Sequence, residues 1–253
     1  MIFDLTGRTA LVTGSSRGIG KVLAAGLAAA GAEVVLHGRD EVALAAVRAE
    51  LEDAGASGVR TVSFDVTDPA AVRAAVAALD GQTGGIDILV NNAGIQHRAP
   101  FLDFELADWD KLVAVNLTSA FLVGQQVARG MVARRHGKII NIGSVQTQLG
   151  RPGITPYAAT KGGIGMLTKG MCADLAPYGI CVNALAPGYV ATELTSALVE
   201  DEAFSAWVST RTPAGRWGRV EDLVGTAVYL ASSASDFVHG QIIFVDGGMT
   251  AVV

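Results

Sequence analysis

The chain has few cysteines, little excess charge and no long apolar run, and each absence narrows what it can do. Only two cysteines, Cys172 and Cys181, occur among 253 residues, so no disulfide framework is implied. The net charge of −5 disfavours nucleic acid or an anionic membrane surface as a partner. The longest uncharged stretch, 175–192, contains two prolines and an asparagine, which suit a strand and loop rather than a membrane span.

Other signals that would point to particular classes are also missing. The first eight residues lack the basic and apolar regions of a signal peptide. The four histidines and two cysteines show no metal-ligand spacing, and no G-x-S-x-G turn predicts a serine hydrolase. We therefore expect a soluble, cytoplasmic protein without a metal site, a nucleic-acid partner or a membrane attachment.

Apolar strand-like runs alternate with helical patterns along the whole chain. The predicted strands cover 9–13, 33–37, 59–64, 87–90, 138–142, 181–185 and 241–245. The predicted helices cover 18–30, 41–54, 69–80, 109–135, 156–176 and 220–231. This alternation implies parallel strands joined by right-handed crossovers, and strands apolar on both faces indicate a sheet covered on both sides. We predict one α/β domain over 1–253, a doubly wound seven-stranded parallel sheet interrupted by an insertion at 193–219.

Tyr157 and Lys161 stand four positions apart in a predicted helix and therefore share a helix face. A neighbouring cation favours the ionised form of a phenol. Lowering the phenol pKa from about 10 to about 7 takes roughly 4 kcal/mol of differential stabilisation. The pair predicts a tyrosine that exchanges protons near neutral pH. The alternative reading is a surface tyrosine and lysine without a catalytic role.

A glycine-rich turn follows the first predicted strand and precedes a helix. Gly14 permits a tight turn, Gly18 lets the backbone approach a pyrophosphate, and Gly20 lets helix and strand pack closely. Free N–H groups at the start of that helix favour a negative charge. The turn predicts a dinucleotide site, although its spacing is G-x-x-x-G-x-G rather than G-x-G-x-x-G.

In order and spacing, these motifs resemble the short-chain dehydrogenase/reductase family over essentially the whole chain. The matching residues are Thr13-Gly14-x-x-x-Gly18-x-Gly20, Asn91-Asn92-Ala93-Gly94, Asn116, Ser144, Tyr157-x-x-x-Lys161 and Pro187-Gly188. The resemblance implies a Rossmann fold, NAD(P)-dependent hydride transfer with Tyr157 as general acid or base, and an insertion that folds over the substrate. A non-catalytic, cofactor-binding regulator is the remote alternative, and it usually has a broken Ser–Tyr–Lys set.

The resemblance also assigns roles to individual residues. The implied catalytic residues are Asn116, Ser144, Tyr157 and Lys161, with Ser144 bonding the substrate oxygen. Asn116 would relay protons through a water to Lys161, and the alternative is a buried asparagine bonded to backbone. The implied cofactor-binding residues are Gly14, Ser16, Arg17, Gly18, Ile19, Gly20, Arg39, Asp65, Val66, Asn92, Ala93, Gly94, Tyr157, Lys161, Pro187, Gly188, Val190 and Thr192.

The end of the second predicted strand indicates which dinucleotide is preferred. An acidic residue at this place holds a ribose 2′-hydroxyl, whereas an arginine suits a 2′-phosphate. Gly38 stands where NAD-preferring relatives carry Asp, and Arg39 follows it. Arg17 in the glycine turn is a second cation, and the arginine fork matches phosphate oxygens. We predict a preference for NADP(H), with NAD(H) possible, and Asp40 as a cap of the next helix.

A narrower resemblance, to the gluconate 5-dehydrogenases of that family, is carried by several segments: 91–98, 149–157, 170–172, 197–204, 211–218, 235–240 and 244–249. The chain departs from them at Gly143 and Val145, where Cys and Met are usual, and both positions flank Ser144. The resemblance implies interconversion of D-gluconate and 5-keto-D-gluconate. The alternatives are a 3-oxoacyl-carrier-protein reductase and another sugar-acid or polyol dehydrogenase of the family.

Two arginines support a sugar acid as the substrate. Arg98 and Arg151 flank the predicted active-site loops, and arginine binds a carboxylate bidentately. A carboxylate fits this pair better than an acyl thioester, and surface solvation is the alternative role. The predicted substrate-binding residues are Arg98, Ser144, Arg151 and Tyr157.

Two predicted helices, 109–135 and 156–176, are apolar over more of their circumference than one sheet face requires. The family resemblance suggests that they pair across a two-fold axis, and that the last strand with 249–253 forms a second interface. Two perpendicular two-folds would give a D2 homotetramer.

Overall fold

The computed structural model describes residues 2–253 and contains a seven-stranded parallel sheet. The strands are β1 (Thr9–Val12), β2 (Glu33–Gly38), β3 (Arg60–Ser63), β4 (Ile88–Asn91), β5 (Gly137–Ile142), β6 (Ile180–Pro187) and β7 (Ile242–Val245). Their order is β3-β2-β1-β4-β5-β6-β7, and each neighbouring pair runs parallel. This confirms the predicted doubly wound sheet. The order reverses between β1 and β4, where such folds open a crevice at the carboxyl ends of the strands.

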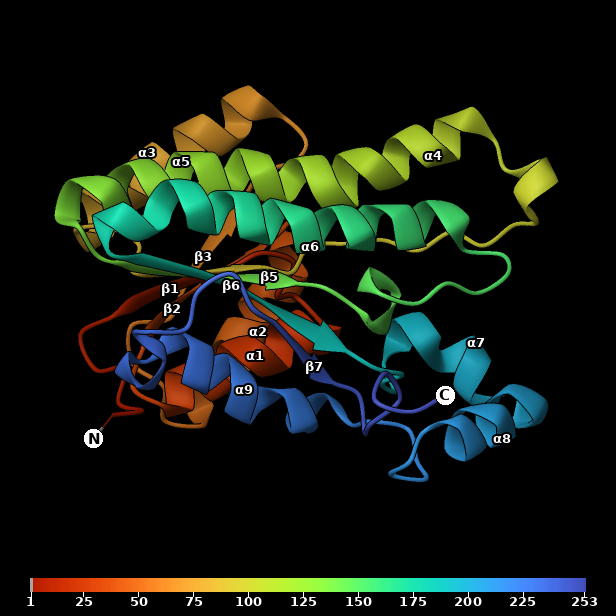
Figure 1. The fold of residues 1–253 in the computed structure, drawn as a ribbon. Coiled ribbons are helices and arrows are strands. Elements are labelled where there is room, and N and C mark those ends of the chain that lie inside the picture. The colour runs from red at the N-terminus through yellow and green to blue at the C-terminus, as the bar shows by residue number, and fades with distance from the viewer. Residues whose placement is uncertain (1) are drawn as a thin grey trace.

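Helices cover both faces of the sheet (Figure 1). One face carries α3 (Pro69–Thr83), α5 (Ser119–Arg134) and α6 (Thr155–Leu175), with α4 (Leu106–Val113) leading into α5. The other face carries α1 (Gly18–Ala29), α2 (Glu41–Asp53) and α9 (Val224–Ala231). Two short helices, α7 (Ser196–Val199) and α8 (Glu202–Arg211), lie beyond the arrowheads of β6 and β7. No helix within residues 2–253 is long and apolar enough to cross a membrane.

Two hydrophobic clusters hold these layers together. Alternate strand residues enter opposite clusters, because successive side chains on a strand point to opposite faces. Leu11 joins the cluster that contains Val76 of α3, whereas Val12 joins the cluster that contains Leu23 of α1. Fully burying one such side chain is worth about 1.5–3 kcal/mol. Burial on both faces explains why the strands are nearly continuous apolar runs.

The predicted helix 109–135 consists of three parts. α4 and α5 are joined without a break by a π-helical turn, Ala114–Thr118, which places Asn116 in the interior. Nothing in the composition of this turn distinguishes it from an ordinary α-helix. π-turns of this kind are frequent at functional sites because they re-aim a side chain.

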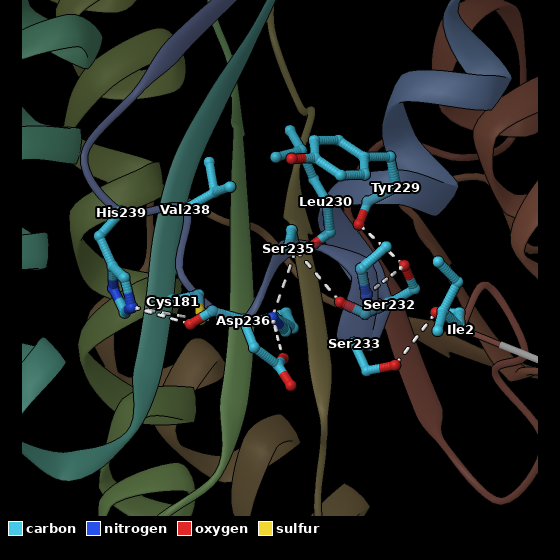
Figure 2. A network of polar contacts seen from close by, with 12 residues as sticks. Ile2, Cys181, Tyr229, Leu230, Ser232, Ser233, Ser235, Asp236, Val238 and His239 are labelled. Atoms are coloured by element: carbon cyan, nitrogen blue, oxygen red, sulfur yellow. Dashed lines mark hydrogen bonds and ion pairs between the residues drawn. The ribbon is translucent and has the colours of Figure 1, made fainter.

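A network of polar contacts lies near the amino-terminal ends of the strands (Figure 2). Lys138 of β5 is buried, and its Nζ lies 2.7 Å from Asp236 Oδ1 and 3.3 Å from Ser235 Oγ. Ser233 Oγ donates to the carbonyl of Ile2 at 3.1 Å. These bonds fix the segment that precedes β7 and so support the edge strand of the sheet.

Candidate active site

A cavity of about 550 Å³ opens at the carboxyl ends of the strands. Of the residues predicted for catalysis, cofactor and substrate, Asn116 alone does not line it; those that do are Gly14, Ser16, Arg17, Gly18, Ile19, Gly20, Arg39, Asp65, Val66, Asn92, Ala93, Gly94, Arg98, Ser144, Arg151, Tyr157, Lys161, Pro187, Gly188, Val190 and Thr192. The fold thus brings together residues that are up to 178 positions apart, from Gly14 to Thr192.

The glycine turn is shaped to receive a phosphate group. Gly14 and Gly18 have φ of +65° and +56°, a region that favours glycine. A Cβ on Gly14 would lie 3.0 Å from Ala93 Cα, and one on Gly20 would collide with the Gly14 carbonyl. Gly18 has nothing within 4 Å of its Cβ position, so the backbone there is open to the cavity. The first turn of α1 has no acidic residue and no side-chain cap, which leaves its N–H groups for an anion.

The loop after β4 braces this turn. Asn92 Nδ2 donates to the carbonyls of Thr13 and Gly14 at 2.9 and 3.0 Å. The backbone N–H groups of Asn92 and Ala93 donate to Thr13 Oγ1 at 2.9 and 3.0 Å. The Asn-Ala-Gly loop therefore has a structural role in holding the turn, in addition to its place on the cavity wall.

The end of β2 presents cations to the cavity. Arg39 and Arg17 both line it, and neither forms a salt bridge within residues 2–253. The Asp40 carboxylate accepts from the N–H of Ala43 at 3.0 Å and caps α2, as predicted. That carboxylate is therefore engaged, and two free guanidinium groups remain where a ribose phosphate would lie. The residues fit a dinucleotide that carries a 2′-phosphate.

Asp65 lies near this end of the cavity. Its Oδ1 accepts from the N–H and hydroxyl of Thr67 at 2.8 and 2.7 Å. These hydrogen bonds lower the pKa of the carboxyl group, with a smaller contribution from the charge of Arg39. The Asp65 side chain holds its own loop, and the predicted binding of the cofactor by Asp65 and Val66 stays a prediction.

The far wall of the cavity follows β6. A Cβ on Gly188 would lie 2.7 Å from Asp246 Cα, so the close packing of two loops requires glycine there. Val190 is buried and forms a bridge with Gly218. The N–H of Thr192 donates to Thr195 Oγ1 at 2.9 Å at the start of the inserted segment. These contacts fix the wall that faces the glycine turn.

Ser144, Tyr157 and Lys161 all line the cavity. Ser144 lies two residues after the end of β5, and Tyr157 and Lys161 lie one turn apart on α6. Lys161 Nζ donates to the carbonyl of Ile142 at 2.7 Å and lies 5.7 Å from the centre of the Tyr157 ring. Burial lowers the pKa of Lys161 from 10.5 to about 8.

The predicted lowering of the Tyr157 pKa by Lys161 is wrong for the protein alone. Burial raises the pKa of the phenol above 10.0, and interaction with Ser144 and the charge of Arg98 oppose that rise only in part. The physical reason is that removing the phenolate from water outweighs these favourable contacts. Tyr157 is therefore held in its protonated form, ready to donate.

Asn116 lies behind the cavity wall. Its Oδ1 accepts from the N–H of Ile95 at 2.8 Å, and its Nδ2 donates to the Ile95 carbonyl at 3.0 Å. A weaker contact, 3.4 Å, joins Nδ2 to Thr160 Oγ1. The side chain thus has the backbone-bonded arrangement that was the alternative reading. Its role in a proton relay with Lys161 stays a prediction.

The substrate half of the cavity combines cations with an aromatic cluster. The charge of Arg151 is close enough to Arg98 to lower its pKa, although burial contributes more. The Arg151 guanidinium lies 5.1 Å from the centre of the Phe204 ring. Tyr189 packs edge-on against Phe204 and Trp207, both with ring centres 5.6 Å away. The inserted segment 193–219 therefore contacts the loop that carries Arg151.

Sequence reasoning missed several residues of this half, among them Gln96, Gln146 and Tyr189. Gln146 is buried, and its Oε1 accepts from Ser144 Oγ at 3.1 Å. Gln96 and Tyr189 lie in loops and Gln146 lies in a 3₁₀ turn, and none of the three has a characteristic spacing. The nearest signal was that Gln96 stands two residues before Arg98 and Gln146 two residues after Ser144.

Comparisons with known proteins agree with this geometry. A family model described as Enoyl-(Acyl carrier protein) reductase matches residues 14–250. A gluconate 5-dehydrogenase from Gluconobacter oxydans (strain 621H) is 56% identical over 249 residues, covering 98% of this chain and 97% of that protein. A 5-keto-D-gluconate 5-reductase from Escherichia coli (strain K12) is 51% identical over 256 aligned positions, covering 100% of this chain and 99% of that protein.

Among solved structures, a gluconate 5-dehydrogenase from Burkholderia cenocepacia J2315 in complex with NADP and tartrate is 58% identical. It superposes with a TM-score of 0.97 over 100% of this chain and 98% of that chain. The fold thus occurs in a relative of nearly equal length. On the match over residues 14–250 and on relatives more than half identical, the chain belongs to the short-chain dehydrogenase/reductase family of enzymes.

Proposed function

We propose that this enzyme interconverts D-gluconate and 5-keto-D-gluconate with NADP(H) as the hydride carrier. The relatives more than half identical to the chain have names of this activity, and one was solved with NADP and tartrate, a hydroxy acid. NADP(H), when bound, supplies or accepts the hydride. NAD(H) is the weaker alternative, because Arg17 and Arg39 would lose the 2′-phosphate as a partner.

The observation that carries the proposal is a pair of cations beside the catalytic tyrosine. Arg98 and Arg151 line the cavity, and neither forms a salt bridge within residues 2–253. Both are close enough to Tyr189 to lower the pKa of its phenol, against the larger raising effect of burial. Two like charges held together favour an anion between them, and a carboxylate accepts bidentate bonds from arginine. A sugar acid supplies that carboxylate.

The chain's own residues then account for the proton steps. Tyr157, whose pKa is raised by burial, donates a proton to the keto oxygen in reduction and takes it back in oxidation. The Ser144 hydroxyl donates to Gln146 Oε1 in the structure, and it turns this hydrogen to the same keto oxygen when the substrate binds. The side-chain amine of Lys161 lies next to Tyr157, and its lowered pKa lets it exchange a proton near pH 8. Asn116, the fourth predicted catalytic residue, fixes the backbone of Ile95 through two hydrogen bonds.

The inserted segment 193–219 is proposed to cover the substrate, within a single domain of residues 1–253. Support comes from its contacts: the Arg151 guanidinium lies over Phe204 of α8, and Trp217 Nε1 donates to Ser205 Oγ at 3.1 Å. A cover of this kind excludes water from the hydride transfer. The location is proposed to be the cytoplasm, where NADPH and reduced thiols are available.

We also propose a homotetramer. A hollow of about 450 Å³ between α5 and α6 is lined by Phe121, Ala128, Val132, Met171 and others, and Phe121 is 46% exposed. An exposed apolar face on paired helices suits a second copy of the same chain. The end of the chain supports a second interface, since Val252 is 49% exposed.

The test is a screen of purified enzyme against sugar acids, polyols and 3-oxoacyl esters, each with NADPH or NADH and their oxidised forms. We expect D-gluconate and 5-keto-D-gluconate to give the highest kcat/KM, and NADP(H) to exceed NAD(H). A higher kcat/KM for a 3-oxoacyl ester would overturn the sugar-acid assignment in favour of the acyl reductase alternative.

A further inference from the structure

The hydroxyl group of Ser144 has one hydrogen, and two acceptors compete for it. In the structure Ser144 Oγ donates this hydrogen to Gln146 Oε1 at 3.1 Å, and it is the donor to that oxygen within residues 2–253. In the proposed reaction the same hydrogen turns to the keto oxygen of the substrate. Both side chains are buried and line the cavity, so the Gln146 oxygen then loses its donor. A buried acceptor without a donor is destabilising, and native proteins leave few of them.

The amide group of Gln146 is held in one orientation. The backbone N–H of Gln146 donates to Ser144 Oγ at 3.2 Å, which keeps the residue against the hydroxyl. Burial raises the pKa of the Tyr189 phenol, and the Gln146 side chain is among the contacts that oppose this rise. A neutral group that favours a phenolate does so by donating a hydrogen bond, so the amide nitrogen of Gln146 faces Tyr189. The amide oxygen cannot turn away from Ser144 without breaking this contact.

The place of the Gln146 oxygen selects the donor that can replace Ser144. Gln146 Oε1 and a keto oxygen that accepts from Ser144 each lie one hydrogen bond from the same hydroxyl, so the two acceptors are at most about 6 Å apart. In an open carbon chain, a hydroxyl on the carbon next to the carbonyl lies beside the keto oxygen, and its hydrogen bond can span the remaining distance. Hydroxyls further along the chain lie nearer the carboxylate, for which Arg98 and Arg151 are placed.

We propose that Gln146 accepts a hydrogen bond from a hydroxyl on a carbon adjacent to the keto carbon of the substrate, and that the enzyme thereby selects α-hydroxy ketones. The inference rests on the proposed function. A substrate without this hydroxyl leaves the buried oxygen unpaired when Ser144 bonds the keto group, which is how a site built for a hydroxyl rejects the deoxy analogue. A 3-oxoacyl ester has no hydroxyl beside its keto group and is disfavoured for the same reason. We expect a loss of roughly 5- to 150-fold in kcat/KM for the deoxy analogue.

The experiment measures kcat/KM for the reduction of 5-keto-D-gluconate and of its 3-, 4- and 6-deoxy analogues by the wild type, Gln146→Met and the control Gln148→Met. Methionine keeps the length of glutamine without its amide, and Gln148 is exposed two positions along the same segment. Carbons 4 and 6 adjoin the keto carbon, whereas carbon 3 does not. The wild type and the control should prefer 5-keto-D-gluconate over the 4- or the 6-deoxy analogue by the stated factor. Gln146→Met should treat that pair about equally and keep the wild-type ratio for the 3-deoxy analogue.

A second variant, Gln146→Glu, retains an acceptor oxygen and should retain the preference for the hydroxyl. Binding of NADPH, followed by fluorescence, shows that each variant is folded. The inference is overturned if the wild type reduces 5-keto-D-gluconate and both adjacent deoxy analogues equally well, since water or Tyr189 then supplies the donor. It is also overturned if Gln146→Met keeps every ratio, or if folded Gln146→Glu loses the preference. A wild type that binds NADPH but does not reduce 5-keto-D-gluconate refutes the proposed function itself, and this inference with it.

Discussion

His37 offers a sharp test of how the cofactor site is supported. Its ring is buried at the end of β2, where Nδ1 accepts from the N–H of Gly14 at 3.1 Å. Nε2 lies 3.1 Å from the Phe64 carbonyl and therefore carries the proton of the neutral ring. Burial lowers the pKa of His37 from 6.5 to about 4, in spite of the Phe64 bond. The neutral ring thus connects the glycine turn to the end of β3.

This shift makes stability depend on pH in a defined window. As the pH falls from 6.5 to 4, the unfolded chain takes up a proton that folded His37 refuses, so the folded state loses stability. Well above pH 6.5 neither state is protonated, and the contribution is constant. At about 1.36 kcal/mol per pKa unit, the loss over the window approaches 3 kcal/mol, an upper estimate for one group.

The perturbation is His37→Asn, whose Oδ1 can still accept from Gly14 while the titratable ring is removed. We expect the free energy of unfolding of the wild type to fall more steeply between pH 6.5 and 4 than that of the variant. The difference in slope should reach at most the value that corresponds to uptake of one proton on unfolding. Carboxylates titrate in both proteins and cancel in the comparison. NMR of histidine-labelled protein gives a direct readout, since the signal missing in the variant belongs to His37. Titration of that signal near pH 6.5, or parallel stability curves, would refute the reasoning.

Three further outcomes are expected. Tyr157→Phe keeps the ring but removes the proton donor, so turnover should fall by about 10²–10⁴ while NADPH still binds; turnover within a factor of about three of wild type would contradict the assigned role. Arg39→Ala should raise KM for NADPH by roughly tenfold or more and leave KM for NADH nearly unchanged, with exposed Arg73→Ala as the control; an equal effect on both cofactors would count against the 2′-phosphate contact. Light scattering should give about four times the 26.0 kDa chain mass, and a stable monomer at micromolar concentration would exclude the proposed interfaces.

Most of the sheet could be predicted from the sequence because parallel strands are buried on both faces. Runs such as 10–12 and 88–90 are apolar throughout, and each predicted strand overlaps an observed one. Helix ends were also close where the sequence supplies a cap, as at Asp40 and Asp68. The π-turn was missed, since its five residues have the composition of any α-helix and its register is set by what Asn116 contacts.

The residues of the candidate site also fall into two groups, those that could be predicted from the sequence and those that could not. The glycine turn and the Tyr157–Lys161 pair could be found because backbone geometry and helix spacing leave a pattern in the sequence. Gln146 and His37 could not, because their roles depend on which atoms are buried and which partners come from distant strands. The direction of the Tyr157 pKa shift failed for a related reason: spacing indicates that a cation is near but does not measure the loss of water around the phenol.

The π-turn at Ala114–Thr118 has a consequence for how this protein can change through evolution. The turn contains one residue more than an α-helical turn, and each residue advances a helix by about 100°. Deleting one residue would restore a regular helix but rotate Asn116 away from Ile95, or else rotate the apolar face of α5 off the sheet. Point substitutions at positions of the turn other than Asn116 can be accepted one at a time, whereas a single-codon deletion would disrupt the wall of the cavity and the core in one step. The length of this turn should therefore be inherited more strictly than the identity of most of its residues.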